Sequence, residues 1–229
     1  MSNVNSSPIL EHSNTPLLHH STSPSLEEFR LLAKRGNLIP LIVDLVADSE
    51  TPVSAFAKID NREPCFLFES AEKNEESGRF SFIGFDPLFI FKSSGSAVSI
   101  TENGHTQSFE TKSDPLTELQ KLMARFHFVP PPEISHFVGG AVGYIGYDVV
   151  RFFEPSVPIH SRDDLQAPEM MFMIARTMII FDHRFRKLSL VTNAAIHNHP
   201  SAQGGRDAST RIVGSSMRSQ RARKKRRRG

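Results

Sequence analysis

Two long apolar stretches late in the chain constrain its fold most. Residues 170–181 read MMFMIARTMIIF, residues 187–194 read KLSLVTNA, and the turn-forming segment DHRF lies between them. Runs rich in β-branched and aromatic residues that are bounded by turn residues are typical of paired strands. We therefore predict a long hairpin over residues 170–194, and this hairpin closes the ordered part of the chain.

Further strands and a helix are predicted earlier in the chain. From Arg79 to Thr111, alternating segments are separated by Asp86-Pro87, by residues 93–96 and by Asn103-Gly104, which indicates antiparallel strands with a tight final hairpin. After the capping candidates Ser113 and Asp114, apolar residues recur at helical spacing, namely Leu116, Leu119, Leu122, Met123 and Phe126. Helices interspersed with mostly antiparallel strands predict an α+β domain with packed helices over residues 25–195, and not a parallel doubly wound sheet.

Shorter elements complete the predicted domain. Ser25 and Glu28 have the spacing of a capping box, which predicts a helix over residues 26–35 that stops at Gly36. The run NLIPLIVDLVA is predicted to be extended, and Thr51-Pro52 to begin a second helix. CFLFES reads as an apolar strand that ends in two polar residues, and HFVGGAVGYIGYD as a strand that leads into a helix.

The first 24 residues differ in composition from the middle of the chain. They contain the imperfect repeat PILEHSNT and PLLHHSTS, which is too short for a structural repeat and too polar for a core. We predict a disordered low-complexity leader over residues 1–24. We predict no metal site at its three histidines, because a flexible segment offers no preorganised geometry; they are His12, His19 and His20.

The other end of the chain is strongly basic. Residues 206–229 hold ten Lys or Arg and one acid, a balance of +9, whereas residues 1–205 hold 17 basic and 24 acidic residues, a balance of −7. We interpret residues 196–229 as a disordered basic tail, and the abrupt switch to Arg, Ser and Gly is what a frameshift or a truncated gene would produce. The rival interpretation is a nucleic-acid-binding arm. Its binding would be nonspecific and salt-dependent, because RARKKRRRG holds no aromatic residue for base stacking.

Several other kinds of site are excluded or given a structural role. No apolar run approaches the roughly 20 residues that span a bilayer, and the N-terminus lacks the pattern of a secretion signal, so we expect a cytoplasmic protein without a membrane partner. Cys65 is expected to be a small buried apolar residue.

The glycines at 139, 140, 143 and 146 lack the spacing of a phosphate-binding loop and are predicted to permit close backbone packing. Ion pairs on one helical face, or simple solvation, are expected for Asp148, Arg151 and Glu154.

Three blocks of sequence resemble a known family. They are TPVSAFAKIDNREPCFLFESAEKNEESGRFSFIGFDP at residues 51–87, GGAVGYIGYDVVRFFE at residues 139–154 and DDLQAPEMMFMIARTMIIFDHRFRKLSLVTNA at residues 163–194. Their order and spacing resemble the N-terminal part of anthranilate synthase component I, the large subunit, over residues 37–195. The resemblance implies the fold of that part and a role in tryptophan biosynthesis.

The resemblance also implies a binding site. In the family, a short apolar strand that ends in an acidic residue and a serine lines the allosteric tryptophan pocket, and LFES resembles that element. It therefore implies Glu69 and Ser70 as tryptophan-binding residues, and the matching GRFSF adds Arg79. A carboxylate neutralises the ammonium group of a free amino acid, and a hydroxyl bonds its polar end.

Catalysis is a separate matter. The resemblance implies that chorismate and Mg²⁺ bind in the C-terminal half of the family's enzymes, and no motif of that half has a matching position here. We therefore predict no catalytic residue, no metal ligand and no lyase activity of the chain alone. The family also implies a glutamine amidotransferase subunit as partner. The related aminodeoxychorismate synthase component I stays an alternative, although LFES and GRFSFIGFDP favour the tryptophan branch.

Overall fold

The structure is a computed structural model that describes residues 23–46, 50–59, 64–70, 78–131, 136–157 and 165–196. The predicted leader and basic tail therefore lie almost entirely outside the described residues. The elements, in chain order, are α1 (Leu26–Leu32), β1 (Leu38–Val46), α2 (Pro52–Phe56), β2 (Phe66–Phe68), β3 (Phe80–Ser94), β4 (Ala97–Glu102), β5 (His105–Glu110), α3 (Pro115–Met123), β6 (Ala141–Ile145), the 3-10 helix η1 (Tyr147–Phe152), β7 (Met170–Asp182) and β8 (Lys187–Ala195).

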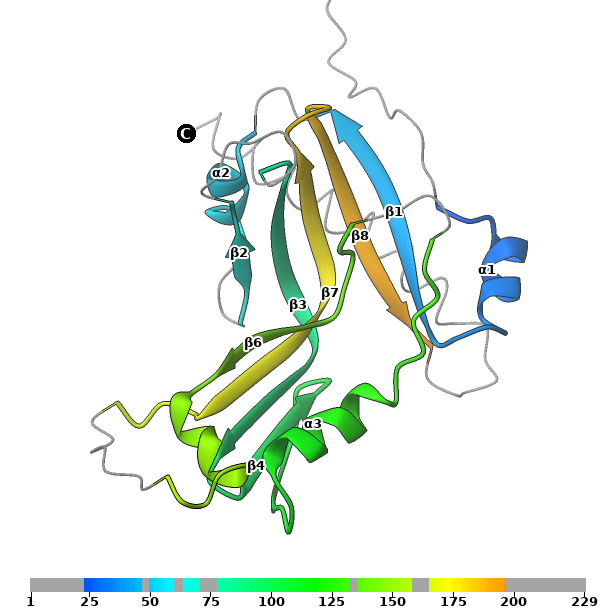
Figure 1. Ribbon diagram of the computed structural model, residues 1–229. Helices are drawn as coiled ribbons and strands as arrows, with labels where there is room; N and C mark the ends of the chain where they lie inside the picture. Colours follow the sequence, from blue (N-terminus) through cyan, green and yellow to red (C-terminus); the bar gives the residue numbers. More distant parts are fainter. Residues whose placement is uncertain are drawn as a thin grey trace, which may run out of the picture.

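One eight-stranded sheet organises the molecule (Figure 1). Its strand order is β1-β8-β7-β3-β4-β5, with β2 paired to β3 and β6 paired to β7. The named strands pair antiparallel throughout. The predicted α+β class with a mostly antiparallel sheet is therefore confirmed. None of the helices in the described parts of the chain is long and apolar enough to cross a membrane.

The predicted hairpins are present. In each of them, hydrogen bonds or backbone angles in the turn explain why the two strands meet. β7 and β8 form the long hairpin, and in its turn the Asp182 carboxylate accepts hydrogen bonds from the backbone N–H groups of Arg184 and Phe185 at 3.1 and 3.2 Å. Asn103 and Gly104 join β4 to β5 with φ values of 52° and 78°. Two positive φ values in succession are the signature of the tight hairpin turn that Asn-Gly favours.

The sequence prediction of a strand boundary at Asp86-Pro87 was wrong. β3 continues through both residues and pairs with β7 on either side of them, with a shift in register between Pro87 and Phe89. Asp86 lies at φ 53°. A bulge accommodates a proline inside a strand because it interrupts the hydrogen-bonding ladder locally. Figure 1 accordingly shows β3 and β7 as two long curved strands that run along the whole sheet.

Two apolar clusters lie at opposite ends of the sheet, which we call the α3 end and the β2 end. At the α3 end, Leu119 and Leu122 of α3 pack on buried side chains of β3 and β4, including Phe89, Phe91 and Val98. The Asp114 carboxylate caps this helix by accepting from the Thr117 N–H at 2.8 Å, as predicted for a capping residue at this place. At the β2 end, a second cluster is built from β1, β7 and β8; it contains Ile42, Met178, Ile180 and Val191.

The other helices differ from prediction mainly in their extent. The capping box of Ser25 and Glu28 is present, but α1 ends at Leu32, earlier than the predicted residue 35. Thr51 caps α2 as expected. The helix predicted after β6 is the 3-10 helix η1, and its Arg151 pairs at 2.5 Å with Glu169, which precedes β7, and so reaches beyond its own helical face.

Candidate functional site at the end of strand β2

A row of aromatic side chains lines one face of the sheet at the β2 end. Phe68 of β2 lies directly opposite Phe82 of β3, so both side chains project from the same face. Phe66 and Phe80 join them, because side chains two residues apart on a strand share a face. The ring centroids lie 4.9 Å apart in the Phe66–Phe68 pair and 6.0 Å apart in the Phe80–Phe82 pair. We call these four residues the aromatic wall.

The segment before β6 extends the aromatic wall. The Phe137 ring meets Phe82 edge-on at 5.8 Å, and His136 lies 4.7 Å from the Phe80 ring. Phe68 and Phe137 keep 51% and 37% of their surface exposed, so flat apolar groups can reach the wall from solvent. Such a surface is suited to stacking with a planar ring.

Phe66 occupies its place because β3 carries a glycine beneath it. A β-carbon added to Gly84 would lie only 2.1 Å from an atom of the Phe66 ring. The two residues are direct partners in the β2–β3 ladder. Gly84 therefore lets the Phe66 ring lie flat on the strand, and any side chain there would displace it.

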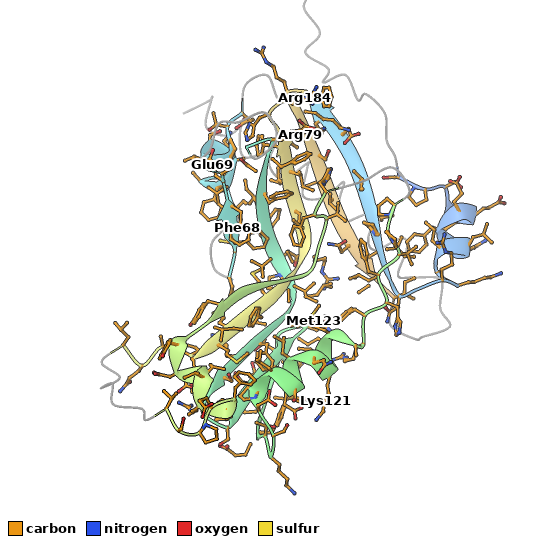
Figure 2. The ribbon with its side chains drawn as sticks, in the orientation of Figure 1. Phe68, Glu69, Arg79, Lys121, Met123 and Arg184 are labelled. Carbon is orange, nitrogen blue, oxygen red and sulfur yellow. The ribbon has the colours of Figure 1, made fainter. Side chains whose placement is uncertain are left out.

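The three residues implied by the family resemblance lie at one end of this wall. Glu69 and Ser70 are exposed and follow the last residue of β2, while Arg79 precedes the first residue of β3. Since the two strands are antiparallel, the end of one lies beside the start of the other. Figure 2 shows Phe68, Glu69 and Arg79 together in this region, with Arg184 of the β7–β8 turn nearby.

Arg79 is engaged by the β7–β8 turn. Its Nη2 donates to Asp182 Oδ2 at 2.7 Å and its Nε to the same oxygen at 3.1 Å. Its guanidinium also lies over the rings of Phe80 and Phe185, at 4.6 and 5.0 Å from their centroids. The hydrogen bond to Asp182 raises the pKa of Arg79. Its role in ligand binding stays a prediction, and its observed contacts fix the start of β3 to the turn.

Contacts in the same turn favour the ionised form of the Asp182 carboxylate. Burial disfavours the ionised carboxylate, but hydrogen bonds from Arg79 and from the backbone of Phe185 and Arg184 outweigh burial and lower the pKa of Asp182. Beside it, His183 Nε2 lies 2.7 Å from the hydroxyl of buried Ser81. Ser81 and His183 had no signal in the sequence, because their proximity depends on the pairing of β3 with β7.

A fully buried asparagine holds the segment that carries His136 and Phe137. Asn193 Nδ2 donates to the carbonyl oxygens of Val138 and Ala175 at 3.1 and 3.3 Å. A β-carbon on Gly139 would lie 2.9 Å from this nitrogen, so the glycine permits the contact. Gly143 likewise lets β6 approach β7, since an added β-carbon would lie 1.8 Å from Met171 O. Gly143 thus shows the predicted close packing of backbone on backbone, whereas Gly139 makes room for a buried side chain.

Other parts of the described chain do not join this site. A shallow groove of about 480 Å³ lies across β3, β4 and β5 at the α3 end and is lined by residues such as Lys92, Ser99 and Ser108. Within the described ranges, no three His, Cys, Asp or Glu side chains are grouped so as to hold a metal ion. Cys65, expected to be buried, is only half-buried just before β2.

Comparison with known proteins now places the chain in a family. Residues 63–228 match the family of chorismate binding enzymes, a range that covers well over half of the chain. The chain belongs to the chorismate binding enzyme family. The matched range runs past β8 into the basic segment, whose residues lie outside those that the structure describes.

Two individual proteins that resemble this chain are both anthranilate synthase component 1. The chain is 34% identical over 177 residues to anthranilate synthase component 1 of Acetivibrio thermocellus, covering 76% of this chain and 35% of the relative. It is 36% identical over 162 residues to the Synechocystis protein of the same name, covering 70% of this chain and 32% of the relative. The chain therefore spans about a third of the length of these relatives.

A solved structure was also matched. Anthranilate synthase component I from Streptococcus pneumoniae aligns with a TM-score of 0.42 and 21% identity, over 75% of this chain and 36% of that one.

Proposed function

We propose that this chain is the tryptophan-sensing N-terminal region of an anthranilate synthase component I. The observation that carries the proposal is the direct pairing of Phe68 with Phe82, which places a half-exposed aromatic row beside Glu69 and Ser70. Both named relatives are anthranilate synthases, which favours the tryptophan branch over aminodeoxychorismate synthesis.

Each part of the ligand has a candidate partner. The indole ring stacks on the exposed part of the aromatic wall, where Phe68 and Phe137 reach solvent. The Glu69 carboxylate neutralises the ammonium group, and the Ser70 hydroxyl bonds the polar end of the amino acid. Arg79 acts by holding the start of β3, since its guanidinium is already paired with Asp182.

The proposal extends to the reaction of the intact enzyme. That enzyme converts chorismate, with glutamine or ammonia, to anthranilate, uses Mg²⁺ and works with a glutamine amidotransferase subunit. This chain alone is expected not to catalyse the reaction, because it matches only about a third of its relatives. The purified chain would be incubated with chorismate, ammonia and Mg²⁺ while anthranilate fluorescence is recorded. Turnover above a control without protein would refute this part of the proposal.

Tryptophan binding can be measured without labels. The chain contains no tryptophan and only two tyrosines, so indole fluorescence excited at the red edge of its absorption reports the free amino acid alone. The anisotropy of L-tryptophan should rise as protein is added, with an affinity in the roughly millimolar range, about 4 kcal/mol. L-phenylalanine in excess tests specificity and should compete weakly.

A pair of variants then tests the named residues. Ser70→Ala should weaken binding about fivefold, which corresponds to roughly 1 kcal/mol for one lost hydrogen bond. Ser99→Ala, on β4 at the α3 end, is the matched control and should bind like the unmodified chain. Equal affinities for both variants, or no rise in anisotropy at all, would contradict the tryptophan-sensing role.

A further inference from the structure

Strand β7 changes its partner part-way along one edge. β3 pairs with β7 from Met170 to Asp182, so β8 and β6 share the other edge of β7. β8 pairs with residues 177–182 of β7, and β6 pairs with residues 170–174. Residues 175 and 176 lie between these two ladders and belong to neither register. A junction between three strands therefore falls at this point of β7.

The side chain of Asn193 lies at this junction. Asn193 is fully buried and follows Thr192, the last residue of β8 that pairs with β7. Its Nδ2 donates to Ala175 O at 3.3 Å and to Val138 O at 3.1 Å. A side-chain amide nitrogen carries two hydrogens, so these two carbonyl oxygens use both. The reverse orientation would place Oδ1, which has no hydrogen-bond partner in the described chain, against two acceptors.

One of these two hydrogen bonds reaches the segment that extends the aromatic wall. Val138 directly follows Phe137, whose ring meets Phe82 edge-on. Among the described residues, no backbone–backbone hydrogen bond joins residues 136–138 to another segment. The Val138 side chain packs into the apolar cluster at the β2 end, but apolar packing is non-directional. The hydrogen bond from Asn193 is therefore what fixes the direction of the backbone beside Phe137.

Gly139 provides the space for the Asn193 amide. A β-carbon added to Gly139 would lie 2.9 Å from Asn193 Nδ2 and 3.5 Å from its Oδ1. Gly139 is not among the residues of the described chain with a positive φ, so the backbone itself tolerates a side chain there. Alanine at this position would therefore displace the amide from its two carbonyl oxygens and leave Asn193 itself unchanged.

We infer that Asn193 is a positioning residue of the tryptophan site. Its amide holds the carbonyl group of Val138, and this contact sets where the Phe137 ring lies against Phe82. The position of Phe137 in turn decides how much of the aromatic wall an indole ring can contact. Asn193 itself does not touch the ligand. The inference rests on the proposed tryptophan-sensing function and names a residue that controls the affinity of the same site.

Two substitutions in the full chain break the same contact in different ways. Asn193→Leu removes both donors, and Gly139→Ala displaces the amide. In each variant without ligand, the nuclear Overhauser effects between the Phe137 and Phe82 rings should be lost. The affinity for L-tryptophan, measured by anisotropy, should fall about two- to tenfold, the size of one aromatic contact. Because both substitutions act on one contact, the double variant should bind no more weakly than the weaker single variant.

Two controls separate positioning from other effects. Leu122→Ala lowers the stability of the fold at the α3 end and should keep both the ring contact and the tryptophan affinity. Ser70→Ala should weaken binding and keep the contact between Phe137 and Phe82. A general loss of stability would thus be recognised from the first control, and a lost ligand contact from the second.

The outcomes distinguish this inference from the proposed function. The inference alone is overturned if tryptophan binds but Gly139→Ala keeps the ring contact, or loses the contact and keeps full affinity. Additive losses of affinity in the double variant would overturn it as well. If Asn193→Leu does not fold, Gly139→Ala decides by itself. An unmodified chain that binds no tryptophan would refute the proposed function, and the inference with it.

Discussion

The two ends of strand β3 use the same kind of residue for different purposes. At the α3 end, Phe89 and Phe91 are 1% and 0% exposed beneath helix α3. At the β2 end, Phe80 and Phe82 are half-buried: Phe82 lies beside Phe68 of β2 and meets Phe137, and Phe80 contacts His136 and the Arg79 guanidinium. Helix α3 packs on the first cluster, whose phenylalanines are fully buried, whereas at the other end Phe68 of the three-residue strand β2 stays half-exposed.

This difference shows how one strand serves both folding and recognition. Aromatic rings that a helix covers contribute to stability through burial and have no surface left for a ligand. Rings covered by a short strand and a loop remain partly available, and at this end they adjoin the polar residues Glu69 and Ser70. We therefore expect substitutions at the α3 end to change mainly stability and substitutions at the β2 end to change mainly tryptophan binding.

The largest contrast between loss of stability and loss of tryptophan affinity is expected for the variants Leu122→Ala and Phe68→Ala. Leu122 is 3% exposed, so its truncation should lower the free energy of unfolding by about 2–5 kcal/mol and leave tryptophan affinity of the folded chain unchanged. Phe68 is 51% exposed, so its truncation should cost much less stability but weaken tryptophan binding by about 0.5–1.5 kcal/mol. Urea unfolding and ligand anisotropy measure the two quantities. The reverse pattern would abolish the distinction between the ends.

An intermediate effect is expected from Gly84→Ala. The added methyl group would overlap the Phe66 ring, so we expect a loss of about 1–3 kcal/mol in the free energy of unfolding together with weaker tryptophan binding. Gly104→Ala is the control, because a side chain at its positive φ strains the backbone while nothing lies within 4 Å of the added atom. It should reduce stability without changing affinity. If Gly84→Ala retains full affinity, Phe66 does not belong to the binding surface.

The smallest effect is a dependence of stability on acid pH that comes from Asp182. Its pKa is lowered in the folded chain, so the stabilisation is complete above its unfolded pKa of about 3.9 and is lost as the pH falls through the folded value. Asp182→Asn should therefore lower stability at neutral pH by an amount that shrinks as the pH falls below about 4. Thermal unfolding of both proteins across this range measures it. A difference that stays constant with pH would mean that the Arg79–Asp182 pair contributes no charge-dependent stability.

Local signals in the sequence account for much of the fold. The Asn103-Gly104 turn, the capping residues Ser25 and Thr51, and the hairpin of β7 and β8 follow from residues close together in the chain. The strand boundary predicted at Asp86-Pro87 was wrong, because a proline is compatible with either a strand end or a bulge. Its outcome was decided by pairing with β7, which is distant in sequence.

The candidate site depended more strongly on such distant contacts. Family likeness pointed to Glu69 and Ser70, but it carried no information on what surrounds them. Arg79 pairs with Asp182 across 103 residues of sequence, and Asn193 reaches Val138 across 55. Neither contact leaves a periodic or spaced signal, because each arises only when the sheet has formed. The aromatic wall likewise becomes visible only once β2 is placed beside β3.

The central claim is that the β2 end binds tryptophan at Glu69 and Ser70, and chemical-shift titration of the backbone amides tests it most directly. L-tryptophan should shift the amides of Glu69, Ser70 and Phe82 in a saturable manner, while those of α3 remain unchanged. L-phenylalanine should cause smaller shifts, since its ring covers less of the aromatic wall. Shifts that avoid Glu69 and Ser70, or that are equal for the two amino acids, would contradict the account.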